Sequence, residues 1–255
     1  RAALAAALAA LAEAEALFSL HRADSALARL NAAGALAAAP APFLDLVREA
    51  RAVSAATGGF FDATVQPLWA ASAQGGDAEA ARRLVGWRDL RAEGGGARFA
   101  RPGMAASFNG IAQGWAADRV AAALRAHGFA DALIDMGEFM GAGRRGAAPW
   151  RIGVAHPAGG IAAEIDLRDR ALATSAPRAT LVGPQGAAHV FDPVGAPGAR
   201  WAQISVVAAT AARADALATA LAAAPMGEAR RLLRAGGGDE AVAIAEDGAV
   251  LRLRG

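Results

Sequence analysis

The sequence predicts an α+β fold in one domain, with a helical N-terminal part followed by mixed or antiparallel strands flanked by helices. The first third is rich in alanine and leucine, and short apolar strands begin near Arg98. Helices do not alternate regularly with these strands, which disfavours a doubly wound parallel sheet. No stretch resembles a linker between autonomous domains, and 255 residues suffice for one domain with a substantial core. We therefore expect residues 1–255 to form a single domain.

Helices are predicted where alanine and leucine dominate between glycine breaks. Leu4–Leu30 has a helical composition, and a second helix over Phe43–Ala56 is stopped by Gly58-Gly59. Glycine-rich turns are expected at 75–77 and 94–96. Later helices are expected over Ile111–His127, Ala212–Ala224 and Met226–Arg234.

Short apolar runs bounded by turn residues predict the strands. The expected strands are Ala132–Met136, Trp150–Ala155, Ile161–Leu167, Ala188–Phe191, Gln203–Ala208, Ala241–Ala245 and Val250–Leu253.

The composition argues against a nucleic-acid partner. Lysine is absent, so arginine supplies all 26 basic residues; with 24 acidic residues the formal net charge is only +2. The sequence pI of 10.6 reflects the absence of Lys, Tyr and Cys, because almost nothing then titrates between roughly pH 8 and pH 12. Arginine pairs such as Arg82-Arg83 are not interleaved with aromatic residues. We therefore expect no nucleic-acid binding.

The sequence contains no evident membrane span or targeting segment. Glu13 and Glu15 interrupt the apolar stretch Arg1–Leu20, which we interpret as a helix of the folded domain. The absence of cysteine excludes disulfides, thiolate zinc sites and cysteine nucleophiles. Composition alone leaves both the cytoplasm and the periplasm open.

A first candidate site lies in the segment 107–118, where a strand is expected to end at Ser107 and a helix to begin after Gly110. A helix N-terminus carries free N–H groups and partial positive charge, which suit a phosphate. The glycine leaves its carbonyl accessible to a cation. A helix cap with a packing glycine is the simpler alternative for this segment alone.

A second candidate site is the pair Asp215 and Thr219, which are four residues apart and therefore on one helix face. Mg²⁺ prefers such hard oxygen ligands together with substrate phosphates and water. Alternatively, Asp215 interacts with the helix dipole and Thr219 hydrogen-bonds to the preceding turn.

Two further segments carry aromatic and titratable side chains. In an extended run His189 and Phe191 share a face, and His189 beside a phosphate could act as a base. Phe60 and Phe61 follow a double glycine and could form an apolar wall for a flat ring. A structural histidine and ordinary core phenylalanines are the alternatives.

Taken together and in order, these segments strongly resemble the ApbE family of FAD:protein FMN transferases, from about Phe18 to about Gly227. Any one of them alone would be unspecific, whereas the ordered set is specific. The matching segments are His21–Asn31, Gly58–Trp69, Ser107–Asp118, Asp135–Glu138, Leu172–Ser175, His189–Pro197, Ser205–Val207 and Ala214–Thr219.

The resemblance implies a T-fold-like domain that binds FAD and Mg²⁺ and transfers FMN to a threonine hydroxyl of an acceptor protein, releasing AMP. By position, the implied metal ligands are the Gly110 carbonyl, Asp215 and Thr219, and His189 is the histidine needed for activity, as a base or to position the hydroxyl. The implied flavin and phosphate contacts are His21, Phe60, Phe61, Asp62, Ser107, Gln113 and Phe191.

The resemblance also implies a cellular context. The acceptor would be an electron-transfer or quinone-reductase subunit carrying a threonine flavinylation motif. The compartment would be the periplasm or the inner membrane, with any membrane attachment lying outside this chain. Helix starts at Gly110 and Ala212 would both present positive ends to the pyrophosphate.

Three departures from the family pattern are visible. Gln113 replaces a Lys or Glu of many relatives, and Ala218 replaces a third metal-facing carboxylate found in some. The family's N-terminal strand, with a Met-Gly-Thr-like flavin contact, is not found before Arg1. Two alternative functions stay open: a metal-dependent FAD pyrophosphatase that gives FMN and AMP, and an FAD-binding protein without turnover.

Overall fold

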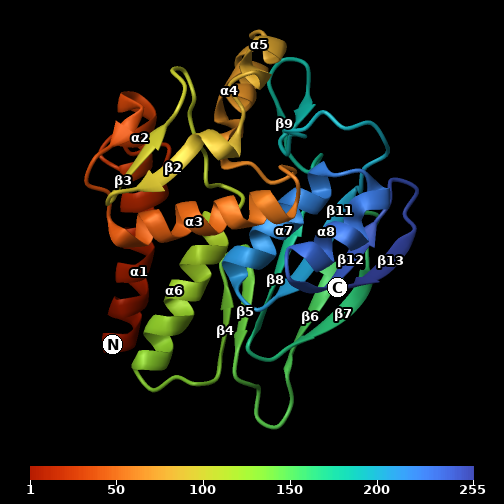
Figure 1. The fold of residues 1–255 in the computed structure, drawn as a ribbon. Coiled ribbons are helices and arrows are strands. Elements are labelled where there is room, and N and C mark those ends of the chain that lie inside the picture. The colour runs from red at the N-terminus through yellow and green to blue at the C-terminus, as the bar shows by residue number, and fades with distance from the viewer.

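A six-stranded antiparallel sheet organises the computed structural model, which describes residues 1–255 (Figure 1). The strand order is β13-β12-β11-β8-β5-β4. Its strands are β4 (Ala132–Asp135), β5 (Phe139–Ala142), β8 (Arg170–Ser175), β11 (Gln203–Ala208), β12 (Gly238–Ile244) and β13 (Val250–Arg254).

Both faces of this sheet are covered, because successive side chains along a strand point to opposite sides. On β11, Ile204 and Val206 belong to the main core shared with the helices. Val207 points the other way and packs with Ile152 and Ile165 of a separate hairpin. The hairpin consists of β6 (Trp150–Ala155) and β7 (Ile161–Leu167).

The helices cover the first face of the sheet. Helix α7 packs on β8 and β11, α6 packs between α1 and α7, and α3 lies across them (Figure 1). The helices are α1 (Ala2–Phe18), α2 (Ala26–Ala33), α3 (Ala41–Ala56), α4 (Gln66–Gln74), α5 (Ala78–Arg82), α6 (Ala112–Ala126), α7 (Ala211–Ala223) and α8 (Ala229–Ala235). Short 3₁₀ turns are η1 (Ala63–Val65), η2 (Trp87–Asp89) and η3 (Met226–Glu228).

Besides the β6-β7 hairpin, two small antiparallel sheets lie outside the main one. The first has the order β1-β3-β2, and the second pairs β9 with β10 beside α4 (Figure 1). Their strands are β1 (Ala35–Leu36), β2 (Leu90–Glu93), β3 (Gly96–Phe99), β9 (Leu181–Val182) and β10 (Ala187–Ala188).

The predicted α+β class and the helical N-terminal part are confirmed, with one helix corrected. Leu4–Leu30 is two helices, because the chain leaves α1 after Phe18 and Ser25 starts a new helix. The Ser25 hydroxyl accepts a hydrogen bond from the Ala28 N–H, a standard N-cap, and donates to the Ser19 carbonyl.

The other predicted helices and most strands agree with the structure to within about three residues. The sequence did not predict β5 and β8, two central strands of the main sheet. No helix of the structure is both long and apolar enough to cross a membrane.

Candidate active site

The N-terminal turn of α6 lies directly against the start of α7, and Gly114 makes this approach possible. A Cβ atom at Gly114 would stand 2.2 Å from the Ala211 carbonyl oxygen and 2.6 Å from the Ala212 nitrogen. Without that Cβ, the Gly114 N–H points at α7 and donates a hydrogen bond of 3.3 Å to Asp215 Oδ2. Gly114 thus allows the segment 107–118 to contact the segment that contains Asp215.

Asp215 is buried on the second turn of α7, with 5% of its surface exposed. Burial raises its pKa well above the usual value, and the negative charge of Glu138 raises that pKa further, while the Gly114 N–H partly opposes both. No basic side chain acts on this carboxyl. Asp215 therefore lacks the positive partner that a buried carboxylate normally has.

Asp215, Thr219 and Gly110 together form a group that we call the Asp215 corner. A Cβ atom at Gly110 would lie 2.7 Å from Thr219 Oγ1, so the backbone of residue 110 lies against the threonine hydroxyl. Asp215 and Thr219 project from one face of α7, four residues apart. The structure thus brings together the three residues that the resemblance implies as metal ligands.

The start of α7 is not available to a phosphate, which corrects one expectation. Asp118 of α6 accepts hydrogen bonds from the N–H groups of Ala211 at 2.8 Å and Ala212 at 3.0 Å. In addition, the Thr210 hydroxyl accepts a hydrogen bond from the Arg213 N–H. The prediction of a positive helix end at Ala212 was wrong, because the chain's own carboxylate already occupies it.

Glu138, directly before β5, lies near this group of residues but was assigned no role in the sequence analysis. It is 7% exposed, and its Oε2 atom has no hydrogen-bond partner. Burial raises the pKa of Glu138 to about 7; the Thr174 backbone N–H opposes this rise, and the charge of Asp135 adds to it. Its sequence signal was membership in the matching segment Asp135–Glu138, which was assigned no ligand or contact.

A surface cavity of about 550 Å³ opens beside the first turn of α6. Predicted flavin contacts His21 and Gln113 both line it, and both are exposed. The Gln113 amide nitrogen lies 3.5 Å from where a Gly137 Cβ would stand, which brings the cavity next to Glu138. The lining residues are Leu11, Ala14, Glu15, Phe18, Ser19, Leu20, His21, Asn109, Ala112, Gln113, Ala116 and Met136.

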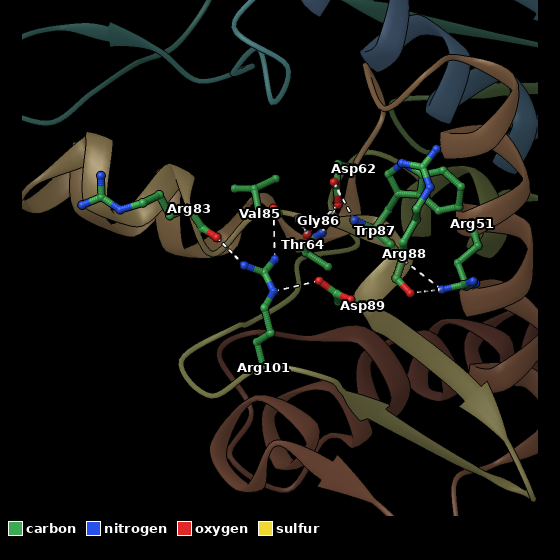
Figure 2. Close-up of polar contacts among 10 residues, drawn as sticks. All are labelled: Arg51, Asp62, Thr64, Arg83, Val85, Gly86, Trp87, Arg88, Asp89 and Arg101. Atoms are coloured by element: carbon green, nitrogen blue, oxygen red, sulfur yellow. Dashed lines mark hydrogen bonds and ion pairs between the residues drawn. The ribbon is translucent and has the colours of Figure 1, made fainter.

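Three other predicted flavin contacts are buried and do not line this cavity. Phe60 and Phe61 are 8% and 3% exposed and belong to the main core. Asp62 is held entirely by protein donors: Oδ1 accepts from the N–H and hydroxyl of Thr64, and Oδ2 from the Trp87 N–H (Figure 2). Burial outweighs these bonds and raises the pKa of Asp62.

An arginine helps to hold this segment in place. Arg101 forms an ion pair of 2.7 Å with Asp89 and hydrogen-bonds to the carbonyls of Val85 and Arg83 (Figure 2). The Gly86 N–H donates to the Thr64 hydroxyl at 2.7 Å, which ties the 86–89 turn to Asp62. Half-buried Ser107 joins the same region, because its N–H donates to the Ala63 carbonyl.

The His189 segment also departs from the predicted strand. Extended pairing ends at Ala188, and Asp192 Oδ1 accepts the N–H groups of Val194 and Gly195 to form a turn. His189 and Phe191 therefore do not share a strand face; both are half-buried. The Nδ1 atom of His189 lies 3.1 Å from the Thr180 carbonyl oxygen.

That contact fixes the tautomer of the neutral imidazole. A carbonyl only accepts hydrogen bonds, so Nδ1 carries the proton and Nε2 presents a lone pair. Arg200 holds the following loop: its guanidinium pairs with Asp192 Oδ2 at 2.7 Å and donates to the carbonyls of Ala196 and Ala223.

Comparisons with known proteins agree on one family. The model of the ApbE family matches residues 2–243. An FAD:protein FMN transferase of Vibrio cholerae is 30% identical over 235 residues, covering 83% of this chain and 70% of that protein. One from Salmonella typhimurium is 28% identical over 231 residues, covering 80% of this chain and 66% of that protein.

Solved structures give the same result. The flavinyl transferase ApbE of Pseudomonas stutzeri, in its apo form, matches with a TM-score of 0.85 and 26% identity, covering 98% of this chain and 85% of that one. The chain therefore spans about two thirds of the length of its curated relatives, and nearly all of it matches the solved fold.

Proposed function

The chain belongs to the ApbE family, and on that premise we propose that it is an FAD:protein FMN transferase. It would move the FMN portion of FAD to a threonine hydroxyl of an acceptor protein, with Mg²⁺ bound and AMP released. The observation that carries the proposal is the buried Asp215 carboxylate, which accepts the Gly114 N–H and has no basic side chain acting on it. A hard divalent cation suits such a group.

The donor set at this corner fits Mg²⁺. Asp215 offers a carboxylate, Thr219 a hydroxyl and Gly110 a backbone carbonyl, and the Gly110 backbone lies against Thr219. No group of three or more His, Cys, Asp or Glu side chains is arranged for a metal ion, so substrate phosphates and water would complete the shell. When bound there, Mg²⁺ offsets charge on the attacked phosphoryl group and on departing AMP.

We assign the cavity at the first turn of α6 to FAD. Phe18 and Met136 supply apolar surface, and His21 and Gln113 supply polar groups at its edge. Ser107 and Phe191 are half-buried and stay in the proposal as contacts. We assign the buried residues Phe60, Phe61 and Asp62 a supporting role, because their surfaces are covered by protein and the neighbouring Ala63 carbonyl accepts the Ser107 N–H.

His189 is assigned as the general base. With its proton held on Nδ1 by the Thr180 carbonyl, the ring presents the Nε2 lone pair to an incoming hydroxyl. The base accepts the threonine proton as the threonine oxygen bonds to the phosphorus of the FMN moiety. The bond from that phosphorus to the bridging oxygen breaks, and the oxygen leaves with AMP.

The decisive experiment incubates the protein with FAD, Mg²⁺ and an acceptor domain containing an Asp-Gly-x-Ser/Gly-Ala/Gly-Thr sequence, as expected for an electron-transfer or quinone-reductase subunit. Covalent flavin fluorescence on the acceptor, lost when its threonine becomes alanine, supports the proposal. Free FMN and AMP without labelled acceptor would indicate hydrolysis instead. Bound, unchanged FAD would indicate a carrier.

We further propose that the protein works in the periplasm or at the inner membrane.

The histidine and the cation are tested in the same assay. His189→Ala should abolish transfer while FAD still binds; full transfer by this variant would refute its assignment as base. EDTA should stop the reaction, and added Mg²⁺ should restore it.

A further inference from the structure

Glu138 holds the only carboxylate oxygen in the structure that is buried without a hydrogen-bond partner. Its residue surface is 93% covered, since 7% remains exposed. A buried carboxylate without a compensating partner is costly, and proteins normally pair it or use it to bind a metal. Glu138 therefore requires an explanation that the fold alone does not supply.

Glu138 lies beside the proposed cation site. The preceding residue, Gly137, abuts the Gln113 side chain on the first turn of α6. The next residue on that turn, Gly114, donates its N–H to Asp215. The negative charge of Glu138 contributes to raising the pKa of Asp215, so the two carboxyls lie within electrostatic range of each other.

No positive charge balances this pair. Apart from burial, the groups acting on the two carboxyls are the N–H groups of Gly114 and Thr174, the Asp135 carboxylate and the Glu138 carboxylate itself. Arginine, the only strong base in the chain, forms no ion pair with either carboxyl. Two buried acids that repel each other are costly to ionise, and a bound cation would offset that cost.

We propose that Glu138 supplies a second carboxylate to the divalent-cation site formed with Asp215, Thr219 and Gly110. The inference rests on the proposed function and adds a ligand to its site. Ala218, on the same helix as Asp215, is fully buried and offers no side-chain oxygen, so the second carboxylate comes from Glu138, directly before β5. Two carboxylates balance the charge of a divalent cation without a substrate phosphate, so the cation should also bind in the absence of FAD.

The experiment measures Mn²⁺ binding to flavin-free protein at pH 8 by electron paramagnetic resonance, which requires no activity. The variants are Glu138→Gln, Asp215→Asn and the control Asp135→Asn, an exposed carboxylate three residues from Glu138. Wild type should bind one Mn²⁺. Glu138→Gln should weaken binding by about tenfold or more, and Asp135→Asn by less than about threefold. A circular dichroism spectrum verifies that each variant is folded.

The outcomes separate this inference from the proposed function. If Glu138→Gln binds Mn²⁺ as wild type does while Asp215→Asn does not, Glu138 is no ligand but the cation site stands. If wild type binds Mn²⁺ only with FAD present, the second carboxylate is likewise refuted. If wild type fails to bind even with FAD, the cation assignment of the proposed function fails, and this inference fails with it.

Discussion

The backbone of Gly110 and the hydroxyl of Thr219 are packed so closely that a Cβ atom at position 110 would lie 2.7 Å from Thr219 Oγ1. It would also lie 3.1 Å and 3.2 Å from Thr219 Cγ2 and Cβ. The two residues are 109 positions apart in sequence and come from a loop and a helix. Glycine at 110 is therefore a requirement of the site geometry and not of backbone conformation, since its φ is not positive.

Gly110→Ala should displace the Thr219 side chain, because Thr219 has no room beside a new methyl group. We expect FMN transfer to fall at least about tenfold, with Mn²⁺ affinity falling in parallel, since misplacing one group by about 1 Å can cost about a hundredfold in rate. Covalent flavin fluorescence and Mn²⁺ titration measure the two effects. Gly227→Ala is the matched control, because a Cβ there meets nothing within 4 Å; equal effects of both substitutions would contradict the site assignment.

The sequence predicted those strands that have a continuous apolar or alternating run, and missed strands that lack one. Strands β6, β7 and β11 matched their apolar runs to the residue. Strand β5, Phe139-Met140-Gly141-Ala142, contains a glycine and lacks alternation, so no local pattern marked it. Glycine is needed at position 141, because a Cβ atom there would lie only 2.7 Å from Leu167 Cβ of the hairpin. This close approach is visible only in the folded chain.

The candidate site was predictable only where it depends on residue type and order. Asp215 and Thr219 were identified because they belong to the ordered set of segments that resembles the family; their helical spacing, which puts them on one face, left a purely structural role open. The capping of α7 by the Asp118 carboxylate could not be predicted, because Asp118 lies 93 residues before Ala211 in sequence. Glu138 was missed for the same reason: its burial and unpartnered oxygen arise from tertiary packing.

Gly114→Ala should destabilise the fold strongly. The new methyl would overlap the Ala211 carbonyl and the Ala212 nitrogen, which are backbone atoms and cannot rotate away. Overpacking of this kind costs roughly 3 kcal/mol, more than the ~1 kcal/mol that alanine gains over glycine in a helix. Urea unfolding should show the loss, and Gly227→Ala again serves as control. A stability equal to wild type would mean that α6 and α7 are farther apart than described.

The stability should depend on pH through Asp118. Burial raises the pKa of this carboxyl above its usual value, although the N–H groups of Ala211 and Ala212 oppose the rise. A carboxyl whose folded pKa exceeds the unfolded value, about 3.9, binds a proton on folding between the two pKa values. Its contribution to the free energy of unfolding therefore decreases as pH rises from about 4 through the raised pKa, and is constant above it.

Asp118→Asn isolates this contribution. An amide has a single acceptor oxygen, so one of the two hydrogen bonds to the start of α7 is lost, at a cost of about 1 kcal/mol. The advantage of wild type over the variant should be largest near pH 4 and shrink as pH rises, in urea unfolding measured at several pH values. An advantage that grows with pH would show that the N–H groups outweigh burial and lower the pKa.

Arg200→Lys tests whether the loop that follows His189 must be held rigidly. The Arg200 guanidinium pairs with Asp192 and donates to the carbonyls of Ala196, Gly198 and Ala223. A lysine ammonium cannot reproduce this planar set of donors, so several of these bonds are lost at once. We expect faster proteolysis within residues 176–200 and slower FMN transfer.

The same variant should bind Mn²⁺ and FAD as wild type does, because Arg200 contacts neither the Asp215 corner nor the cavity at α6. Arg151→Lys is the matched control: its ion pair with Asp166 is exposed and contributes little. A rate loss confined to Arg200→Lys would indicate that the loop positions His189 for proton removal. Unchanged transfer together with faster proteolysis would show that the loop can move freely without affecting the base, which would count against His189 in that role.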